Sequence, residues 1–205
     1  MSPRTAAALR GDDTSLRDHL IEAARRLVAE RGTAGPTVRD IAREAGVADG
    51  VLYNHFAGKE ELLALGLDAH VRAVDPGAPV PEPGSGTVEA NLRTLVRRGF
   101  ELHGAIVPAF VGLLSQPKVL SAYASLPKTS VPLREVLSDY LRGEQELGRL
   151  AAFADVGAAV TLISGAWHDL VLRGLLAGVV PGSVEPDDRL VDSLVATVLR
   201  GIARH

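Results

Sequence analysis

Cysteine is absent from the 205 residues, which excludes structural disulfides and thiolate metal sites. Long apolar runs are also missing, because the most apolar stretch, 156–180, is interrupted by His168, Asp169 and Arg173. The first residues lack an apolar core of signal-peptide length. We therefore expect a soluble cytoplasmic protein with no membrane association.

An excess of positive charge is missing as well. Lysine and arginine total 22 against 25 aspartate and glutamate, a net charge of −3, and only three of the cations are lysine. Residues 14–74 carry eight basic and nine acidic side chains, a net of −1. Because phosphate binding needs local positive charge, any argument for nucleic-acid binding must come from the pattern of residues.

What the sequence does contain is helical periodicity. We predict an all-α fold, because apolar residues recur at helical spacing and no segment alternates with period two. Residues 1–13 are expected to be a disordered arm, and 75–86, with four prolines and three glycines, a linker. Pro108 should begin or kink a helix. The expected helices span 14–31, 37–45, 48–54, from 59 to about 74, 87–105, 106–116, 118–126, 131–147, 155–178 and 187–203.

Residues 37–56, TVRDIAREAGVADGVLYNHF, have the layout of a helix-turn-helix. Thr37 with Asp40 gives a capped start, Gly46 a stop, and a short second helix follows a tight turn. A rotation of about 100° per residue places Ala48 and Phe56 on the same inward side as Leu52. The outward side then offers Gly50 and Asn54, flanked by Val51 and Tyr53. Asparagine can pair with adenine and valine can touch a thymine methyl group, so this side suits the major groove.

The whole 14–74 block resembles the DNA-binding domain of the TetR family of bacterial transcriptional regulators. The matching residues are Ala24, Leu27, Glu30 and Gly32, the segments 37–42 and 45–47, the pairs 52–53 and 55–56, and Lys59–Leu62. The resemblance implies a three-helix DNA-binding domain at 14–74, followed by a helical ligand-binding and dimerisation domain at 87–205. It implies base contacts from Gly50, Val51 and Asn54. It also implies backbone contacts, which involve Thr37, Arg39, Tyr53, His55 and Lys59.

Asp49 departs from the family pattern, in which lysine, serine or proline is frequent at this position. A carboxylate there is repelled by phosphate, so two roles remain open. Asp49 caps the short helix, which the sequence favours, or it accepts a hydrogen bond from cytosine N4.

Beyond the linker, helix 155–178 is apolar nearly all round and rich in small residues, and helix 187–203 carries one apolar stripe. A helix that is apolar on every side must be covered on every side. In TetR-like proteins the last two long helices form the dimer interface, so we expect a homodimer through these two segments. Candidate ligand-lining residues for an apolar or amphipathic effector are Phe100, His103, Phe110, Leu114, Tyr123, Trp167 and His168.

We expect no enzyme, cofactor or metal site. No nucleophile elbow, phosphate loop or metal-binding cluster appears, and the adjacent His168 and Asp169 point about 100° apart on a helix. We interpret the sequence as that of a ligand-responsive repressor that binds a palindromic operator as a dimer. The alternative is a small-molecule-binding protein of the same fold with lost or weak DNA binding, which the acidic balance and Asp49 favour.

Overall fold

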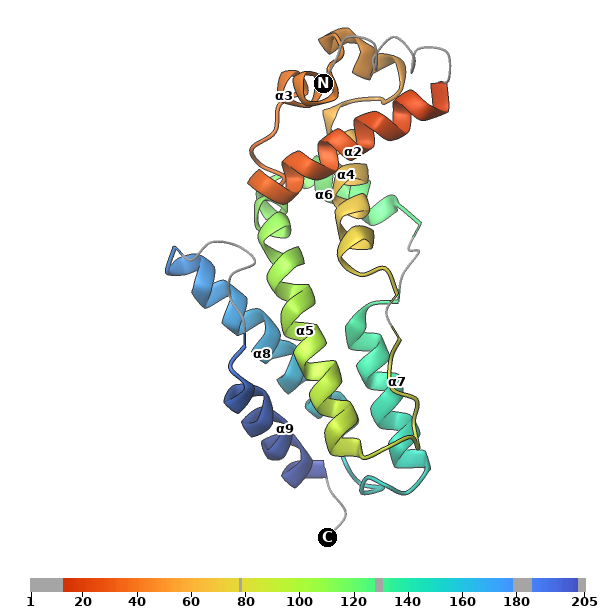
Figure 1. The fold of residues 1–205 in the computed structure, drawn as a ribbon, viewed down its shortest axis with the longest axis vertical. Helices are drawn as coiled ribbons and strands as arrows, with labels where there is room; N and C mark the ends of the chain where they lie inside the picture. The colour runs from red at the N-terminus through yellow and green to blue at the C-terminus, as the bar shows by residue number, and fades with distance from the viewer. Residues whose placement is uncertain (1–12, 78, 128–130, 179–185, 203–205) are drawn as a thin grey trace. The chain divides into compact units, whose positions relative to one another are not determined.

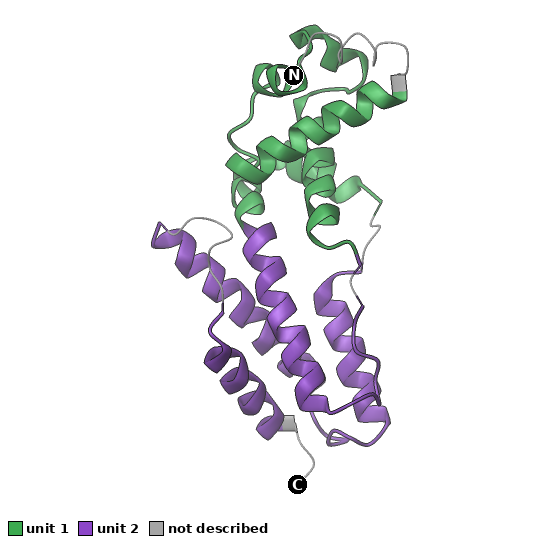
Figure 2. Ribbon diagram, in the orientation of Figure 1, with its two compact units in different colours: residues 1–76, 108–127 green, residues 77–107, 128–205 purple. Residues whose placement is uncertain are grey.

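The computed structural model describes residues 13–77, 79–127, 131–178 and 186–202, so all but the last residue of the expected arm lies outside it. Within the described ranges the chain forms helices and no strand, which confirms the all-α fold (Figure 1). It divides into two compact units, residues 1–76 with 108–127 and residues 77–107 with 128–205 (Figure 2). We describe each unit by itself.

The first unit is built on two helices that pack closely, α2 (Asp13–Arg31) and α4 (Lys59–Val74). Their contact depends on Gly66, where a Cβ would stand 2.8 Å from the Cβ of Ala24. Between them in sequence come α3 (Val38–Ala45) and the short 3-10 helix η2 (Asp49–Asn54). After α5 the 3-10 helix η3 (Gly112–Ser115) and α6 (Pro117–Ser125) complete the unit.

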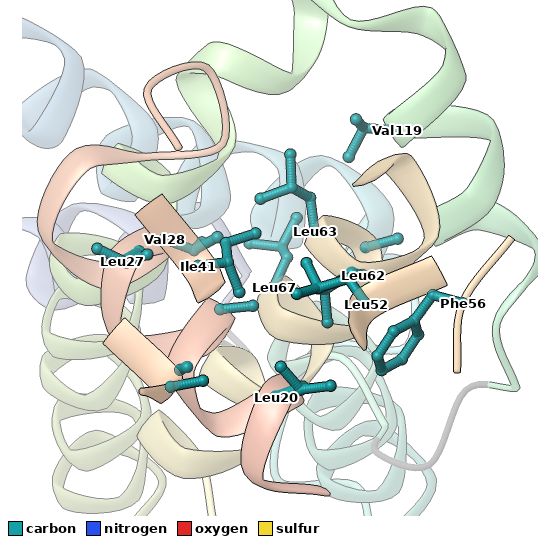
Figure 3. Close-up of a cluster of buried hydrophobic side chains, with 14 of the residues drawn as sticks. Leu20, Leu27, Val28, Ile41, Leu52, Phe56, Leu62, Leu63, Leu67 and Val119 are labelled. Carbon is teal, nitrogen blue, oxygen red and sulfur yellow. The ribbon is translucent and has the colours of Figure 1, made fainter. Parts of the chain in front are cut away.

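One apolar core holds the first unit together, and Figure 3 shows its side chains gathered between the helices. Every helix of the unit places at least one buried residue in it, including the short η2 and η3. The largest members are Leu16, Leu20, Leu27, Ile41, Leu52, Phe56, Leu62, Leu63, Leu67 and Leu113. Because burial of each such side chain contributes about 1.5–3 kcal/mol, this core fixes the positions of α3 and η2.

Helix α5 (Val88–Val111) differs from the two helices expected at 87–105 and 106–116. It runs through Pro108 without interruption, and the 3-10 helix η3 then follows. We expected 87–205 to be one domain, but residues 108–127 belong to the first unit. The physical reason is burial, since Ala109, Leu113 and Val119 are part of the core formed by α2 and α4.

The second unit contains residues 88–107 of α5 together with α7 (Leu133–Glu146), α8 (Val156–Leu176) and α9 (Asp188–Ile202). The proline-rich connection before α5 is held by the fully buried Glu144, whose Oε1 accepts from the backbone N–H of Gly84 at 3.2 Å. Arg149 pairs with Glu144 at 3.2 Å and donates to the Gly86 carbonyl at 2.7 Å. These contacts fix the end of the connection although it has no regular structure.

Ion pairs join α5 to α9 within the second unit. Arg93 donates to Asp192 at 2.6 Å, and Arg97 pairs with Asp188 one turn away. The buried face of α9 is formed by Val191, Val195 and Val198. None of the helices in the described ranges has both the length and the apolar character to cross a membrane.

Candidate nucleic-acid interface

Helix α3 begins and ends where its caps dictate. Thr37 is the N-cap, its Oγ accepts from the Asp40 N–H at 3.1 Å, and Asp40 Oδ2 accepts from the Thr37 backbone N–H at 3.1 Å. The Thr37 hydroxyl also donates to Asp40 at 2.6 Å, and these hydrogen bonds, with Arg43 nearby, lower the pKa of Asp40. At the other end Gly46 adopts φ 69°, which favours glycine, and stops the helix.

The turn after α3 leads directly into η2, the six-residue helix expected to read DNA bases. Leu52 and Phe56 are buried in the core of the first unit, at 3% and 5% exposure. Gly50 and Asn54 are exposed, and the Tyr53 side chain is 62% exposed. Because Leu52 and Phe56 are buried, η2 exposes a small patch to solvent that consists of Gly50, Tyr53 and Asn54.

Two details of η2 differ from the expectation of an α-helical rotation. Ala48 is exposed instead of sharing the inward side with Leu52, because it lies before the helix in extended conformation, with φ −73° and ψ 146°. Val51, expected on the flank of the outward side, is half-buried and packs against the core. The 3-10 helix turns more tightly than 100° per residue, which changes the direction of each side chain.

Asp49 does not cap η2, so the interpretation that the sequence favoured is wrong. The N-cap residue is Ala48, which makes no side-chain capping bond, and Asp49 is the first residue of the helix. Its Oδ2 lies 3.4 Å from Nε of Arg39 in the first turn of α3. The tight turn at 46–48 brings the start of η2 beside the start of α3, which sequence spacing alone does not reveal.

The other residues expected at the DNA backbone lie at element ends. The Arg39 side chain is 84% exposed, and Thr37 is exposed with its hydroxyl bonded to Asp40. His55 is half-buried after η2, and its ring lies 6.4 Å from that of Phe56. Lys59 is the first residue of α4, whose first turn also carries Glu60 and Glu61. Contact of these residues with DNA stays a prediction.

Most arginines of the 14–74 block are paired with carboxylates, a feature that the sequence analysis missed. Four pairs span a single helical turn and follow the i, i+3 or i, i+4 spacing that would have revealed them: Glu22–Arg25, Glu22–Arg26, Asp40–Arg43 and Asp68–Arg72. Three more join different helices, Arg26–Glu44 at 2.8 Å, Arg17–Glu61 at 3.9 Å and Arg39–Asp49 at 3.4 Å. Most positive charges of the block are therefore neutralised locally by a carboxylate of the same block.

The candidate effector residues divide between the two units. Within the second unit Phe100 is 1% exposed and Trp167 is fully buried, with Nε1 donating to the Val96 carbonyl at 3.0 Å. The His103 ring lies 5.0 Å from the indole and 4.7 Å, edge-on, from the His168 ring. Burial lowers the pKa of His103, and the neighbouring His168 lowers it further.

Both histidines bond a backbone carbonyl one turn earlier through Nδ1, His103 to Gly99 and His168 to Ser164, each at 2.7 Å. A carbonyl only accepts, so Nδ1 carries the proton in both rings. Asp169 pairs with Arg173 at 2.6 Å instead of with its neighbour His168.

The remaining three candidates belong to the first unit. Phe110 and Tyr123 meet edge-on at 5.3 Å, and both pack against the core. Leu114, in η3, is 84% exposed and so is not enclosed by the described residues of the chain. A role for any of the seven residues in effector binding stays a prediction.

Comparison with known proteins finds similarity in the region of the helix-turn-helix. A sequence profile for "Bacterial regulatory proteins, tetR family" matches residues 20–65. The HTH-type transcriptional repressor KstR2 of Mycobacterium tuberculosis is 51% identical over 53 residues, 26% of this chain and 26% of that protein. The HTH-type transcriptional regulator TtgR of Pseudomonas putida is 47% identical over 53 residues, 26% of this chain and 25% of that protein. The matched stretch is thus about a quarter of each relative.

Solved structures extend the likeness in fold to nearly the whole chain. The TetR family transcription regulator SCO0332 covers 92% of this chain and 99% of its own, with 27% identity and a TM-score of 0.59. FadR of Bacillus subtilis, solved with stearoyl-CoA, covers 90% of this chain and 98% of its own, with 20% identity and a TM-score of 0.55. The profile match assigns the helix-turn-helix region, residues 20–65, to the tetR family of bacterial regulatory proteins, and a solved TetR family regulator shares the fold over most of the chain.

Proposed function

We propose that the protein is a transcriptional repressor that binds a palindromic operator as a homodimer and is released by a small effector. The observation that carries the proposal is the outward patch of η2, where Gly50, Tyr53 and Asn54 are exposed while Leu52 and Phe56 anchor the helix in the core. The capped α3 and the αL glycine at 46 hold that patch rigidly. A rigid support favours sequence readout, because little order is lost on binding.

Each exposed residue has a role in the proposed complex. Asn54 pairs with adenine N6 and N7, and Gly50 allows the backbone to approach the base edges. Tyr53, Thr37, Arg39, His55 and Lys59 contact the sugar-phosphate backbone. Val51 touches a thymine methyl with the part of its side chain that is not packed against the core.

Dimerisation through α8 and α9 is supported by an apolar stripe left uncovered along α8. Leu162, Leu172 and Leu176 are 63%, 44% and 88% exposed. They share a helical face with the exposed small residues Gly157, Ala158 and Gly165, which permit close approach of a second helix. A two-fold dimer presents two η2 helices to successive major grooves about 34–36 Å apart.

We propose that the effector is apolar or amphipathic and binds in the second unit beside His103 and His168. The indole of Trp167 offers an apolar ring, and the imidazole of His103, whose pKa is lowered by burial, keeps Nε2 as a hydrogen-bond acceptor with His168 beside it. Effector binding would change the separation of the two η2 helices and so weaken operator binding, a coupling between two sites. The name of KstR2, a repressor, supports the direction of control.

One observation favours the alternative, a ligand-binding protein with little DNA affinity. The arginines of α2 and α3 that would attract phosphate are paired with carboxylates of the chain itself, as in Arg43–Asp40 and Arg26–Glu44. Such pairs reduce the counterion release that drives DNA binding.

Selection of bound duplexes from a random-sequence pool tests the two functions. The repressor predicts enrichment of a two-fold-symmetric motif, and failure to enrich any duplex at low salt would leave only the ligand-binding function. Native mass spectrometry of the purified protein, followed by addition of the extracted small molecule to the DNA complex, tests release. An effector that tightens the complex would reverse the proposed direction of control.

A further inference from the structure

Arg39 and Asp49 face each other across the turn of the helix-turn-helix. The guanidinium Nε and the carboxylate Oδ2 are 3.4 Å apart, with the side chains 84% and 53% exposed. Asp49 makes no capping bond to η2, so its carboxylate is not needed to start the helix. It directly precedes Gly50, the first residue of the patch proposed to meet the bases.

The carboxylate of Asp40, on α3, already has other partners. Asp40 accepts from Thr37 and pairs with Arg43 at 2.7 Å, so it serves the cap of α3 and a different arginine. Asp49 therefore acts on the charge of Arg39, the residue proposed to meet a phosphate beside η2. In water an exposed pair of this kind contributes little to stability. Its larger effect comes when a polyanion approaches the same guanidinium.

We propose that Asp49, by holding the Arg39 guanidinium, lowers the affinity of the helix-turn-helix for the phosphate backbone of any duplex. The inference rests on the proposed DNA-binding function and adds a positioning residue to it. A phosphate must share Arg39 with Asp49 and also meets the repulsion of the carboxylate. Phosphate attraction supplies essentially all sequence-independent binding, so Asp49 keeps binding to non-operator DNA weak. Retention on DNA then depends on base contacts such as that of Asn54.

The substitution Asp49→Asn tests this, because it removes the charge and keeps the shape of the side chain. Fluorescence anisotropy would use the duplex selected most strongly by the wild-type protein and a scrambled duplex of the same composition, from about 50 to 200 mM salt. We expect Asp49→Asn to bind both duplexes about three- to tenfold more tightly at the low-salt end. The slope of log affinity against log salt should steepen by up to about 0.9, one additional phosphate contact.

Glu30→Gln is the matched control, since it removes an exposed carboxylate from α2 of the same unit without altering the Arg39–Asp49 pair. It should change either affinity less than about twofold. Arg39→Gln supplies the second test: in that background Asp49→Asn should bring no gain, because the group that Asp49 holds is gone.

Three results would overturn the inference while leaving DNA binding intact. They are an Asp49→Asn protein that binds like the wild type, a gain that persists without Arg39, and a changed base preference, which would make Asp49 a reader of bases. If neither the wild type nor Asp49→Asn enriches any duplex from the pool, the proposed DNA-binding function itself is wrong.

Discussion

The indole of Trp167 lies directly against the Cα of Gly99, so that a Cβ built on Gly99 would stand only 2.0 Å from Cε2 and 2.3 Å from Cζ2. The indole N–H donates to the Val96 carbonyl three residues earlier on α5, at 3.0 Å. Trp167 is fully buried. Helices α5 and α8 are therefore joined at a point where only glycine fits.

The substitution Gly99→Ala should lower the free energy of unfolding by about 1–3 kcal/mol, the usual cost of overpacking a core. This loss should appear although alanine favours the helix by about 1 kcal/mol over glycine. Urea unfolding followed by circular dichroism measures it. In a Trp167→Phe background, where the overlapping ring atoms are gone, the same alanine should cost less. An equal penalty in both backgrounds would show that the indole is not the cause.

Asn54 and Lys59 should differ in the kind of binding that they support. Asn54→Ala removes a base contact, so discrimination at one operator position should fall by about 1–3 kcal/mol while other positions keep their preference. Lys59→Ala should weaken every sequence alike and reduce the salt slope by about one. Competition binding with single-base operator variants separates the two effects. A uniform loss from Asn54→Ala would assign that residue to the phosphate backbone instead.

If the exposed apolar stripe of α8 forms the dimer interface, a charged side chain introduced into that stripe should abolish the dimer. Leu162 is 63% exposed in the single chain, and Leu162→Glu would bury a carboxylate if a second copy covered it. Sedimentation equilibrium should therefore find a dimer for the wild type and a monomer for this variant. Leu147→Glu is the control, because Leu147 is 57% exposed but lies outside α8 and α9. A dimer that survives Leu162→Glu would place the interface elsewhere.

The lowered pKa of His103 makes stability depend on pH in a defined direction. Burial disfavours the charged ring, so as the pH falls through the ordinary value of 6.5 the unfolded chain takes up a proton before the folded chain does. The stability contributed by the neutral ring is fully present above that value and is lost between it and the lower folded pKa. Urea unfolding at about pH 8 and about pH 5.5 should show this loss in the wild type.

His103→Gln supplies the comparison, since glutamine does not titrate in this range. Its unfolding free energy should fall less on acidification than that of the wild type. Equal pH dependence in the two proteins would mean that His103 titrates as it does in the unfolded chain.

Local features of the helix-turn-helix are predictable from sequence because they depend on neighbours along the chain. Thr37 and Asp40 form the capping box, Gly46 adopts the left-handed conformation that ends α3, and Leu52 points to the core. Caps and turns use contacts within about four residues, so their sequence signatures are direct. The outward direction of Asn54 follows from the burial of Leu52 in the same way.

Contacts between distant residues were decided only by the tertiary structure. Helix α5 passes through Pro108 and ends in the core of the first unit because Ala109 and Leu113 are buried there, which overrides the local tendency of proline to break a helix. Asp49 pairs with Arg39, ten residues away, because the turn brings two helix starts together. Its place in the sequence favoured a cap for η2, which the structure does not show, and the ion pair with Arg39 appears only in the packed structure. The sequence by itself thus determined the all-α fold and the caps and turn of the helix-turn-helix. The tertiary structure decided the course of α5 and the partners of the ion pairs, because both depend on contacts between residues that are distant along the chain.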